Sequence, residues 1–283
     1  MEEKHYACYH VVTSNFTQSL IIQVIIQATA GGKILFKESD MSQKENIRNS
    51  IQKPKRRSNF LSIILGLTTI VGLPLSIFLS AGRWDWVEGW VYIAIFLLSA
   101  LVSRIYLAIK NPALMTERYQ SLSAESVKAW DRWLMPIVAT FGPLLVLIVA
   151  GLDERFGWLP ELSTGVKIAA TAVMVAGYLL AIWAMNANRF FSGTVRIQTD
   201  RGHQVVSNGP YRLVRHPGYL GGLLSYFGMP LLLGSLWALI PAVLTMMAVV
   251  LRTVLEDETL QKELPGYREY TKKTRSKLIP GIW

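Results

Sequence analysis

The sequence predicts an all-α fold: a polytopic membrane helix bundle with four spanning helices, a C-terminal transmembrane helical hairpin and a cytoplasmic tail. Hydrophobic residues make up 51% of the 283 residues and the mean hydropathy is positive, as is typical of membrane proteins. Four long segments contain no charged side chain, and Lys and Arg residues concentrate in alternate connections between the apolar segments. These observations exclude an ordinary soluble domain.

Residues 1–57 form an N-terminal leader that we expect to be disordered. Their apolar patch, Leu20–Ile26, is interrupted by Gln23 and is far shorter than the roughly 20 residues that a membrane span requires. Residues 1–40 are either part of this leader or a mis-called extension that precedes a natural start at Met41. The solitary Cys8 excludes an internal disulfide and a Cys-based zinc cluster, and no metal site is predicted.

Residues 58–190 are predicted to hold the four spanning helices. The uncharged segments are Ser58–Gly82, Gly89–Ser103, Trp133–Leu152 and Ile168–Asn188. At a rise of about 1.5 Å per residue, roughly 20 apolar residues cross the hydrocarbon core. The second segment reaches this length by extending to Ile109, with Arg104 tolerated near its end.

The last apolar run, Pro217–Leu251, predicts a helical hairpin. Its roughly 35 residues would make a helix of about 50 Å, which is longer than the membrane is thick. The breaker residues in Gly228-Met229-Pro230 and Gly234-Ser235 lie near its middle. We therefore expect two helices, at about 217–233 and 236–258, whose outer ends lie on the same side of the membrane.

The charge distribution predicts that the N- and C-termini are both cytoplasmic, because Lys and Arg collect in short cytoplasmic loops. Basic residues occupy 53–57, 110–132, 189–215 and the tail after Lys262, whereas the connections between them are acidic or nearly neutral. The net charge of +10 is then explained by orientation and by contact with anionic membrane lipids. It gives no reason to expect a nucleic-acid partner, and no oligomeric state is predicted.

Polar residues concentrate in 191–283, which we interpret as a cofactor-binding catalytic region that includes the hairpin. Pro217 suits the first turn of a helix, and the free amides of such a helix start, with Arg215 beside them, can hold a carboxylate or a phosphate. Gly218, Gly221 and Gly222 form a smooth strip on one face, against which a flat ligand or another helix can pack. The hairpin would bring Arg215 and His216 close to residues 252–257, giving a pocket at the lipid boundary.

These residues resemble the isoprenylcysteine carboxyl methyltransferases, within a superfamily that includes the phospholipid methyltransferases. The resemblance is strong over residues 200–283 and extends to the earlier spans only through hydropathy. It is carried by His203, Gly209-Pro210-Tyr211, Arg215-His216-Pro217-Gly218-Tyr219, Gly221, Arg252, Glu256-Asp257, Leu260, Gly266-Tyr267, Tyr270 and Leu278-Ile279-Pro280.

The resemblance implies an integral membrane enzyme that uses S-adenosylmethionine without a Rossmann domain, and the chain has no Gly-rich strand-to-helix fingerprint. It places His203, Tyr211, His216 and Tyr219 in the cofactor site. The paired glutamates of the family fall on Glu256 and Asp257, the second shortened by one methylene. The predicted cofactor-binding residues are His203, Tyr211, Arg215, His216, Pro217, Gly218, Tyr219, Gly221, Glu256 and Asp257.

Arg252 and Glu256 are the predicted catalytic residues. Methyl transfer requires mainly alignment of the two reactants and exclusion of water, and Arg252 can orient an ionised carboxylate by paired hydrogen bonds. The predicted function is therefore O-methylation of a lipid-linked or amphiphilic carboxylate. N-methylation of a phospholipid or small amphiphile stays open, and there His216, Glu256 or Asp257 would have to remove a proton.

Structural roles compete with each of these assignments. Arg215 and Arg252 can lie at the headgroup level as ordinary interfacial residues, and His216 can be a helix cap. The glycines are equally compatible with helix packing. The weaker functional alternative is a transporter or a non-catalytic membrane protein, although the spans before residue 190 contain few ionisable groups and no repeat.

Overall fold

The computed structural model describes residues 71–120 and 126–283. The predictions for the leader, for Cys8 and for the first part of the first span therefore fall outside the described residues. Within the described ranges the chain forms helices and connecting segments but no β-strand. In order, the elements are α4 (Leu73–Ala81), α5 (Val87–Lys110), α6 (Pro112–Gln120), α7 (Asp131–Pro136), the π-helix η3 (Ile137–Phe141), α8 (Gly142–Phe156), α9 (Thr164–Ala187), the short 3₁₀ helices η4 (Thr199–Arg201) and η5 (Gly209–Arg212), α10 (Pro217–Leu232), α11 (Leu239–Glu263) and α12 (Tyr267–Lys273).

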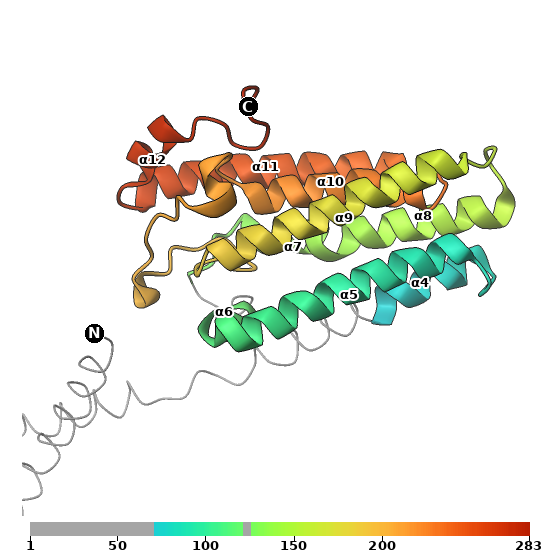
Figure 1. Cartoon of the computed structure of the whole chain (residues 1–283), viewed down its shortest axis with the longest axis horizontal. Helices are drawn as coiled ribbons and strands as arrows, with labels where there is room; N and C mark the ends of the chain where they lie inside the picture. The colour runs from blue at the N-terminus through green and yellow to red at the C-terminus, as the bar shows by residue number, and fades with distance from the viewer. Residues whose placement is uncertain (1–70, 121–125) are drawn as a thin grey trace, which may run out of the picture. The chain divides into compact units, whose positions relative to one another are not determined.

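The long helices run side by side as a bundle (Figure 1). In the described part of the chain, four helical segments are long and apolar enough to cross a membrane: Val87–Lys110, Asp131–Phe156, Thr164–Ala187 and Leu239–Glu263. Many of their apolar side chains point outward, for example Ile109, Leu179 and Met247, which are more than 60% exposed. Such exposure is expected where lipid takes the place of water. The predicted class, an all-α membrane helix bundle, is confirmed.

The span around Pro136 is not a regular α-helix. The α-helix α7 ends at Pro136, and η3 follows as a π-helical turn before α8 begins at Gly142. Proline removes one backbone donor and crowds the preceding turn, which is a common cause of such a bulge. The predicted span, Trp133–Leu152, lies inside this segment and is extended at both ends by polar residues.

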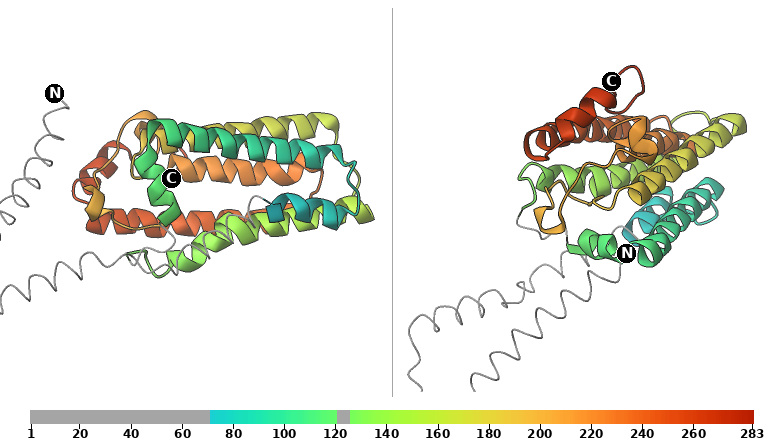
Figure 2. Two further views of the ribbon diagram at one scale, coloured as in Figure 1. Left: turned by 90° about the horizontal axis from the view of Figure 1, so that it is seen from below. Right: turned by 60° about the vertical axis from the view of Figure 1, so that its left-hand side comes forward.

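The hairpin is formed by α10 and α11, which lie next to each other (Figure 2). The chain turns at Gly234, whose φ of 76° lies in the left-handed region that favours glycine. The turn is closed by the Ser235 amide, which donates to the Pro230 carbonyl at 2.9 Å. Gly228 and Pro230, which we expected to help break the run, lie inside α10 instead. At 16 residues, α10 is shorter than the four spanning segments.

Small residues allow α9 and α10 to pack closely. A Cβ added to Gly221 would lie 2.5 Å from the Gly177 carbonyl oxygen and 2.8 Å from the Ala181 amide nitrogen. Only a residue without a side chain fits at this distance, as at other tight helix crossings in membranes. Gly221 was predicted to bind cofactor, and in the structure it packs against α9.

The two ends of the bundle differ in charge. At the end with the connections 82–86, 157–163 and 233–238, Arg83 pairs with Glu154 at 3.1 Å and Lys167 with Glu88 at 2.6 Å. The opposite end holds the basic connections and α12, as the charge pattern predicted. The polar residues singled out in the sequence gather at this basic end.

Candidate functional site

A pocket of about 330 Å³ opens where α10 begins and α11 nears its end. Its walls include Met135 and Ala139 from the span Asp131–Phe156, the connection between α9 and α10, and Tyr267 and Tyr270 of α12. Predicted site residues in its lining are His203, Tyr211, Arg215, His216, Gly218, Tyr219, Arg252 and Glu256. Pro217, Gly221 and Asp257 do not line it, and the site extends to residues before 191.

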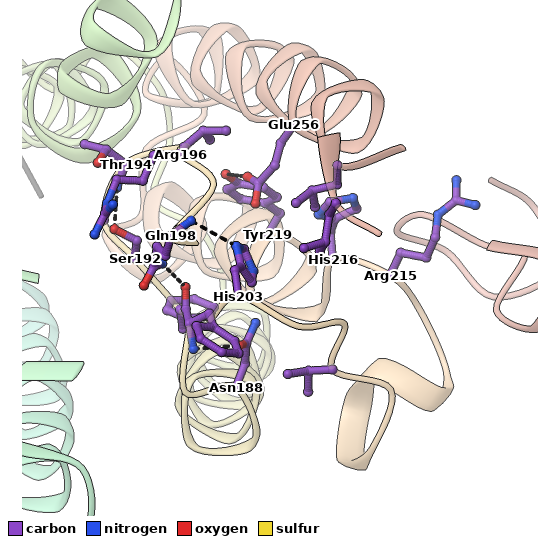
Figure 3. A pocket seen from close by; sticks show the side chains of 18 of the residues that line it. Asn188, Ser192, Thr194, Arg196, Gln198, His203, Arg215, His216, Tyr219 and Glu256 are labelled. Carbon is purple, nitrogen blue, oxygen red and sulfur yellow. Dashed lines mark hydrogen bonds between the residues drawn. The ribbon is translucent and has the colours of Figure 1, made fainter. Parts of the chain in front are cut away.

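The hairpin brings its two outer ends into contact, as predicted. The Tyr219 hydroxyl donates to the Glu256 carboxylate, and the two residues lie together in Figure 3. The Arg252 guanidinium carbon lies 5.4 Å from the centre of the Tyr219 ring, and the His216 ring stacks against Tyr219 at 5.8 Å. An aromatic side chain from α10 is therefore held between a cation and an anion from α11.

Asp257 is the buried centre of a second cluster, at only 1% exposure. It pairs with Arg215 at 3.0 Å, lies 3.2 Å from His216 Nε2, and accepts from the Tyr267 hydroxyl at 3.0 Å and from Gln261 at 2.8 Å. Burial raises the pKa of Tyr267, and the neighbouring Asp257 raises it further, so the phenol keeps its proton and donates. Both oxygens of Asp257 have partners within the protein and the residue does not line the pocket, so we expect it to act as a structural anchor.

Arg215 is correspondingly engaged away from the pocket centre. Its Nη2 donates to Asp257 Oδ2 at 3.1 Å, and Figure 3 shows its side chain to one side of His203, Tyr219 and Glu256. The predicted contact between this guanidinium and a ligand carboxylate therefore competes with a buried ion pair.

The start of α10 is covered by the C-terminal tail. The amides of Arg215 and His216 donate to the carbonyls of Ser276 and Lys277, each at 3.0 Å. The amides of Tyr219 and Leu220 both donate to the His216 carbonyl at 3.1 Å. The helix start that Pro217 marks is thus present, but these four amides are used inside the protein.

Arg252 forms a paired contact with a residue that sequence analysis did not select. Its Nε donates to Asp131 Oδ1 at 2.6 Å and its Nη2 to Asp131 Oδ2 at 3.0 Å, while Nη2 also donates to the Gly193 carbonyl at 2.9 Å. Asp131 is fully buried. Asp131 thus occupies the pair of donors that was expected to orient a substrate carboxylate. Of the three guanidinium nitrogens of Arg252, Nη1 is the one without a hydrogen-bond partner among the described residues.

The connection between α9 and α10 forms one wall of the pocket and is fixed by buried charges. Arg196 makes a paired contact with Glu117 of α6, at 2.9 and 2.7 Å, and pairs with Asp200 at 2.9 Å. These carboxylates raise the pKa of Arg196. The Val195 amide donates to Asp131 Oδ2 at 2.6 Å. The segment therefore depends on Asp131 and Glu117, both from an earlier part of the chain.

His203 lies in this wall as a neutral imidazole. Burial lowers its pKa to about 4, with Arg196 and Arg201 repelling a further positive charge. Its Nδ1 accepts from the backbone amide of Gln198 at 3.3 Å, which places the proton of the neutral ring on Nε2 (Figure 3). The ring also packs against Phe190, with centroids 4.6 Å apart.

Tyr211 is held from both ends. Its hydroxyl accepts from Asn188 at 3.3 Å, and its carbonyl accepts from the Tyr270 hydroxyl at 2.6 Å. Burial raises the pKa of Tyr270 to about 12, so this donor stays protonated.

Of the three glycines Gly218, Gly221 and Gly222, Gly218 is the one that lines this pocket. A Cβ added to it would lie 2.7 Å from the Phe191 ring.

Sequence reasoning missed residues whose role depends on distant partners. Asp131 lies at the edge of an apolar span. Because Arg252 near the end of another span requires an anionic partner, a search for acidic residues at span ends could have identified it. Glu117 and Gln198 lie in polar connecting segments, where no local pattern distinguishes them from surface residues.

Comparisons with known proteins match this part of the chain. The profile of a family described as phospholipid methyltransferase matches residues 166–265. Two curated proteins, each named probable protein-S-isoprenylcysteine O-methyltransferase, from Oryza sativa subsp. indica and subsp. japonica, are 26% identical over 113 residues. Each match covers 39% of this chain and 59% of the relative, so the chain spans about three-fifths of the length of the curated relatives it matches. The resemblance to the isoprenylcysteine carboxyl methyltransferases and phospholipid methyltransferases is confirmed.

Proposed function

We propose that the protein is an integral membrane methyltransferase that uses S-adenosylmethionine and methylates a carboxylate on a lipid-linked or amphiphilic substrate. The observation that carries this proposal is the meeting of the two ends of the hairpin, with Tyr219 bonded to Glu256, in one pocket at the end of the membrane bundle. Both ends of the hairpin lie within residues 166–265, the part of the chain that matches the phospholipid methyltransferase family.

The residues present fit the proposed cofactor. The volume of about 330 Å³ lies within the range of small-molecule sites, and the walls combine aromatic faces with a few polar groups. Phe190 and His203 supply faces for a nucleobase, while Glu256 supplies an acceptor for the amino or ribose groups. The methionine carboxylate would be held by a cationic side chain of the lining. When bound, S-adenosylmethionine supplies an electrophilic methyl group on a positively charged sulfur.

The acceptor carboxylate is already ionised near neutral pH, so the site needs to position it and exclude water. Arg252 is the proposed positioning residue. Because Asp131 occupies Nε and Nη2, the acceptor would be contacted through Nη1 and not through a full fork. The Asp131 pair in turn fixes the orientation of the guanidinium before the substrate arrives.

The second candidate function, N-methylation of a phospholipid or small amphiphile, is favoured by the description of the matching family. An ammonium acceptor would first have to lose a proton. Of the two candidate carboxylates, Asp257 lies 3.2 Å from His216 Nε2 and does not line the pocket. Glu256 is therefore the carboxylate that faces the acceptor. The arginines in the lining favour an anionic acceptor over a cationic one.

The pocket is proposed to lie on the cytoplasmic side, with both termini there. The connections at this end of the bundle carry the excess of Lys and Arg, and those at the opposite end are acidic or nearly neutral. A soluble, zwitterionic cofactor would then reach the site from the cytoplasm, and an amphiphilic acceptor would reach it along the membrane.

The test is calorimetric titration of the purified, detergent-solubilised protein with S-adenosylmethionine. Saturable binding with one site per chain is expected. Absence of saturable binding would reject both enzymatic functions and leave a non-catalytic membrane protein or a transporter. With binding established, transfer of a labelled methyl group is compared between a farnesylated cysteine derivative and phosphatidylethanolamine. Label in a base-labile ester supports O-methylation, and label in the amine supports the alternative.

A further inference from the structure

A second cavity, of about 200 Å³, lies among the membrane helices next to the candidate cofactor site. The walls are contributed by α4, α5, η3, the start of α8, α9 and α10. It shares two wall residues, Ala139 and Gly218, with the first pocket, so the two cavities are adjacent. Most of its lining is apolar, as is suitable for a hydrocarbon chain.

Three tyrosines are the notable polar residues of this cavity: Tyr92 of α5, Tyr178 of α9 and Tyr226 of α10. The Tyr226 hydroxyl donates to the Val138 carbonyl, which the π-helical turn leaves available. Among the described residues, the hydroxyls of Tyr92 and Tyr178 form no hydrogen bond, although Tyr92 is only 2% exposed. A buried phenol usually has a partner, because leaving its hydroxyl unpaired in apolar surroundings is costly.

We propose that this cavity binds the chain of the lipid acceptor and that Tyr92 and Tyr178 hydrogen-bond an oxygen function on that chain. This inference rests on the proposed function and narrows its substrate class. A pure hydrocarbon chain would leave the two hydroxyls unpaired, whereas a hydroxyl, ether or carbonyl oxygen would satisfy them. The proposed acceptor therefore carries an oxygen function on its chain.

Gly222 provides a way to close the cavity without disturbing the packing of the helices. It lines this cavity, and an added Cβ would meet no atom within 4 Å. The adjacent Gly221, by contrast, contacts α9 and has no room for a side chain. Gly222→Leu should thus fill the space that a lipid chain would occupy.

The experiment measures binding of radiolabelled octadecanoic acid and of its positional hydroxy isomers to detergent-solubilised protein by equilibrium dialysis. At least one isomer should bind about threefold to tenfold more tightly than octadecanoic acid, as expected for one hydrogen bond. Tyr92→Phe combined with Tyr178→Phe should abolish this preference without weakening octadecanoic acid binding. Tyr226→Phe is the matched control and should retain the preference, because that hydroxyl is already bonded to Val138.

Gly222→Leu should weaken binding of all these acids, and the milder Gly222→Ala serves if the leucine variant does not fold. The inference is overturned if no isomer is preferred by the wild type, or if the preference survives in the Tyr92 and Tyr178 double variant. Binding of S-adenosylmethionine is measured on the same samples. Cofactor binding without any lipid preference rejects only this inference, and a tyrosine-dependent preference without cofactor binding rejects only the proposed methyltransferase.

Discussion

Asp131 and Arg252, which are 121 residues apart in the sequence, form a buried pair through two hydrogen bonds of 2.6 and 3.0 Å. The pair connects the span Asp131–Phe156 to the end of the hairpin, and Asp131 also accepts from the Val195 amide in the wall of the pocket. One carboxylate therefore fixes both a cationic side chain of the site and the loop that covers it.

Asp131→Asn should destabilise the protein strongly, because it leaves the Arg252 charge buried without its counter-ion. We expect a loss of about 3–5 kcal/mol in the free energy of unfolding, measured by thermal unfolding in detergent. Asp200→Asn is the control, since the Asp200 side chain is 60% exposed and its ion pair to Arg196 should contribute no more than about 1 kcal/mol. Equal losses in the two variants would contradict the role given to Asp131.

Asp257→Asn should also act mainly on stability. The carboxylate is 1% exposed and neutralises Arg215, so its removal leaves a second uncompensated buried charge. A loss of about 3–5 kcal/mol is expected, again from thermal unfolding. If this variant instead unfolded like the wild type but no longer bound S-adenosylmethionine, Asp257 would be a ligand-binding residue and not an anchor.

Glu256→Gln should show the opposite behaviour. Glu256 faces the pocket and accepts from the Tyr219 hydroxyl, so the change replaces a charged acceptor for the cofactor by a neutral amide, with little effect on folding. Calorimetry should show S-adenosylmethionine binding weakened roughly tenfold to a hundredfold, the value of one hydrogen bond to a charged group. Glu258→Gln, a change at an exposed residue two positions along the same helix, should leave the affinity unchanged.

His203 makes the protein less stable in acid. The pKa of His203 is lowered from its ordinary 6.5 to about 4, so between these pH values the unfolded chain binds more protons than the folded one. The contribution of the neutral imidazole is fully present above pH 6.5 and is lost as the pH falls toward 4. His203→Asn should show a smaller decrease in melting temperature over this window, in a pH series of thermal unfolding. Parallel curves for the two proteins would show that another group is responsible.

The adjacent glycines of α10 should respond differently to the same substitution. Gly221→Ala places a Cβ 2.5 Å from the Gly177 carbonyl and should cost about 1–3 kcal/mol through strain at the helix crossing. Gly222→Ala meets no atom within 4 Å and should be neutral or stabilising by up to about 1 kcal/mol, because alanine favours the helix. Thermal unfolding of both variants decides this, and a larger loss at Gly222 would contradict the packing described.

The hairpin illustrates how much of the site followed from the sequence. The length of the run after Pro217 required a turn, which placed residues 215–219 near residues 252–257, and the ion pair between Arg215 and Asp257 agrees with this. The sequence did not separate the roles of Glu256 and Asp257. Their side chains leave the helix in different directions, and only the packing of α12 and the tail decides which of them reaches the pocket.

The sequence by itself determined the membrane bundle, the hairpin and the end at which polar groups collect, because hydropathy, helix length and charge placement are properties of single segments. The tertiary structure alone decided that Asp131 holds Arg252, that Gly221 packs against α9, and that Tyr92 and Tyr178 line a cavity. Such pairings depend on how helices distant in the chain rotate and pack against each other. No periodicity within one segment specifies that rotation, which is why these contacts could not be predicted from it.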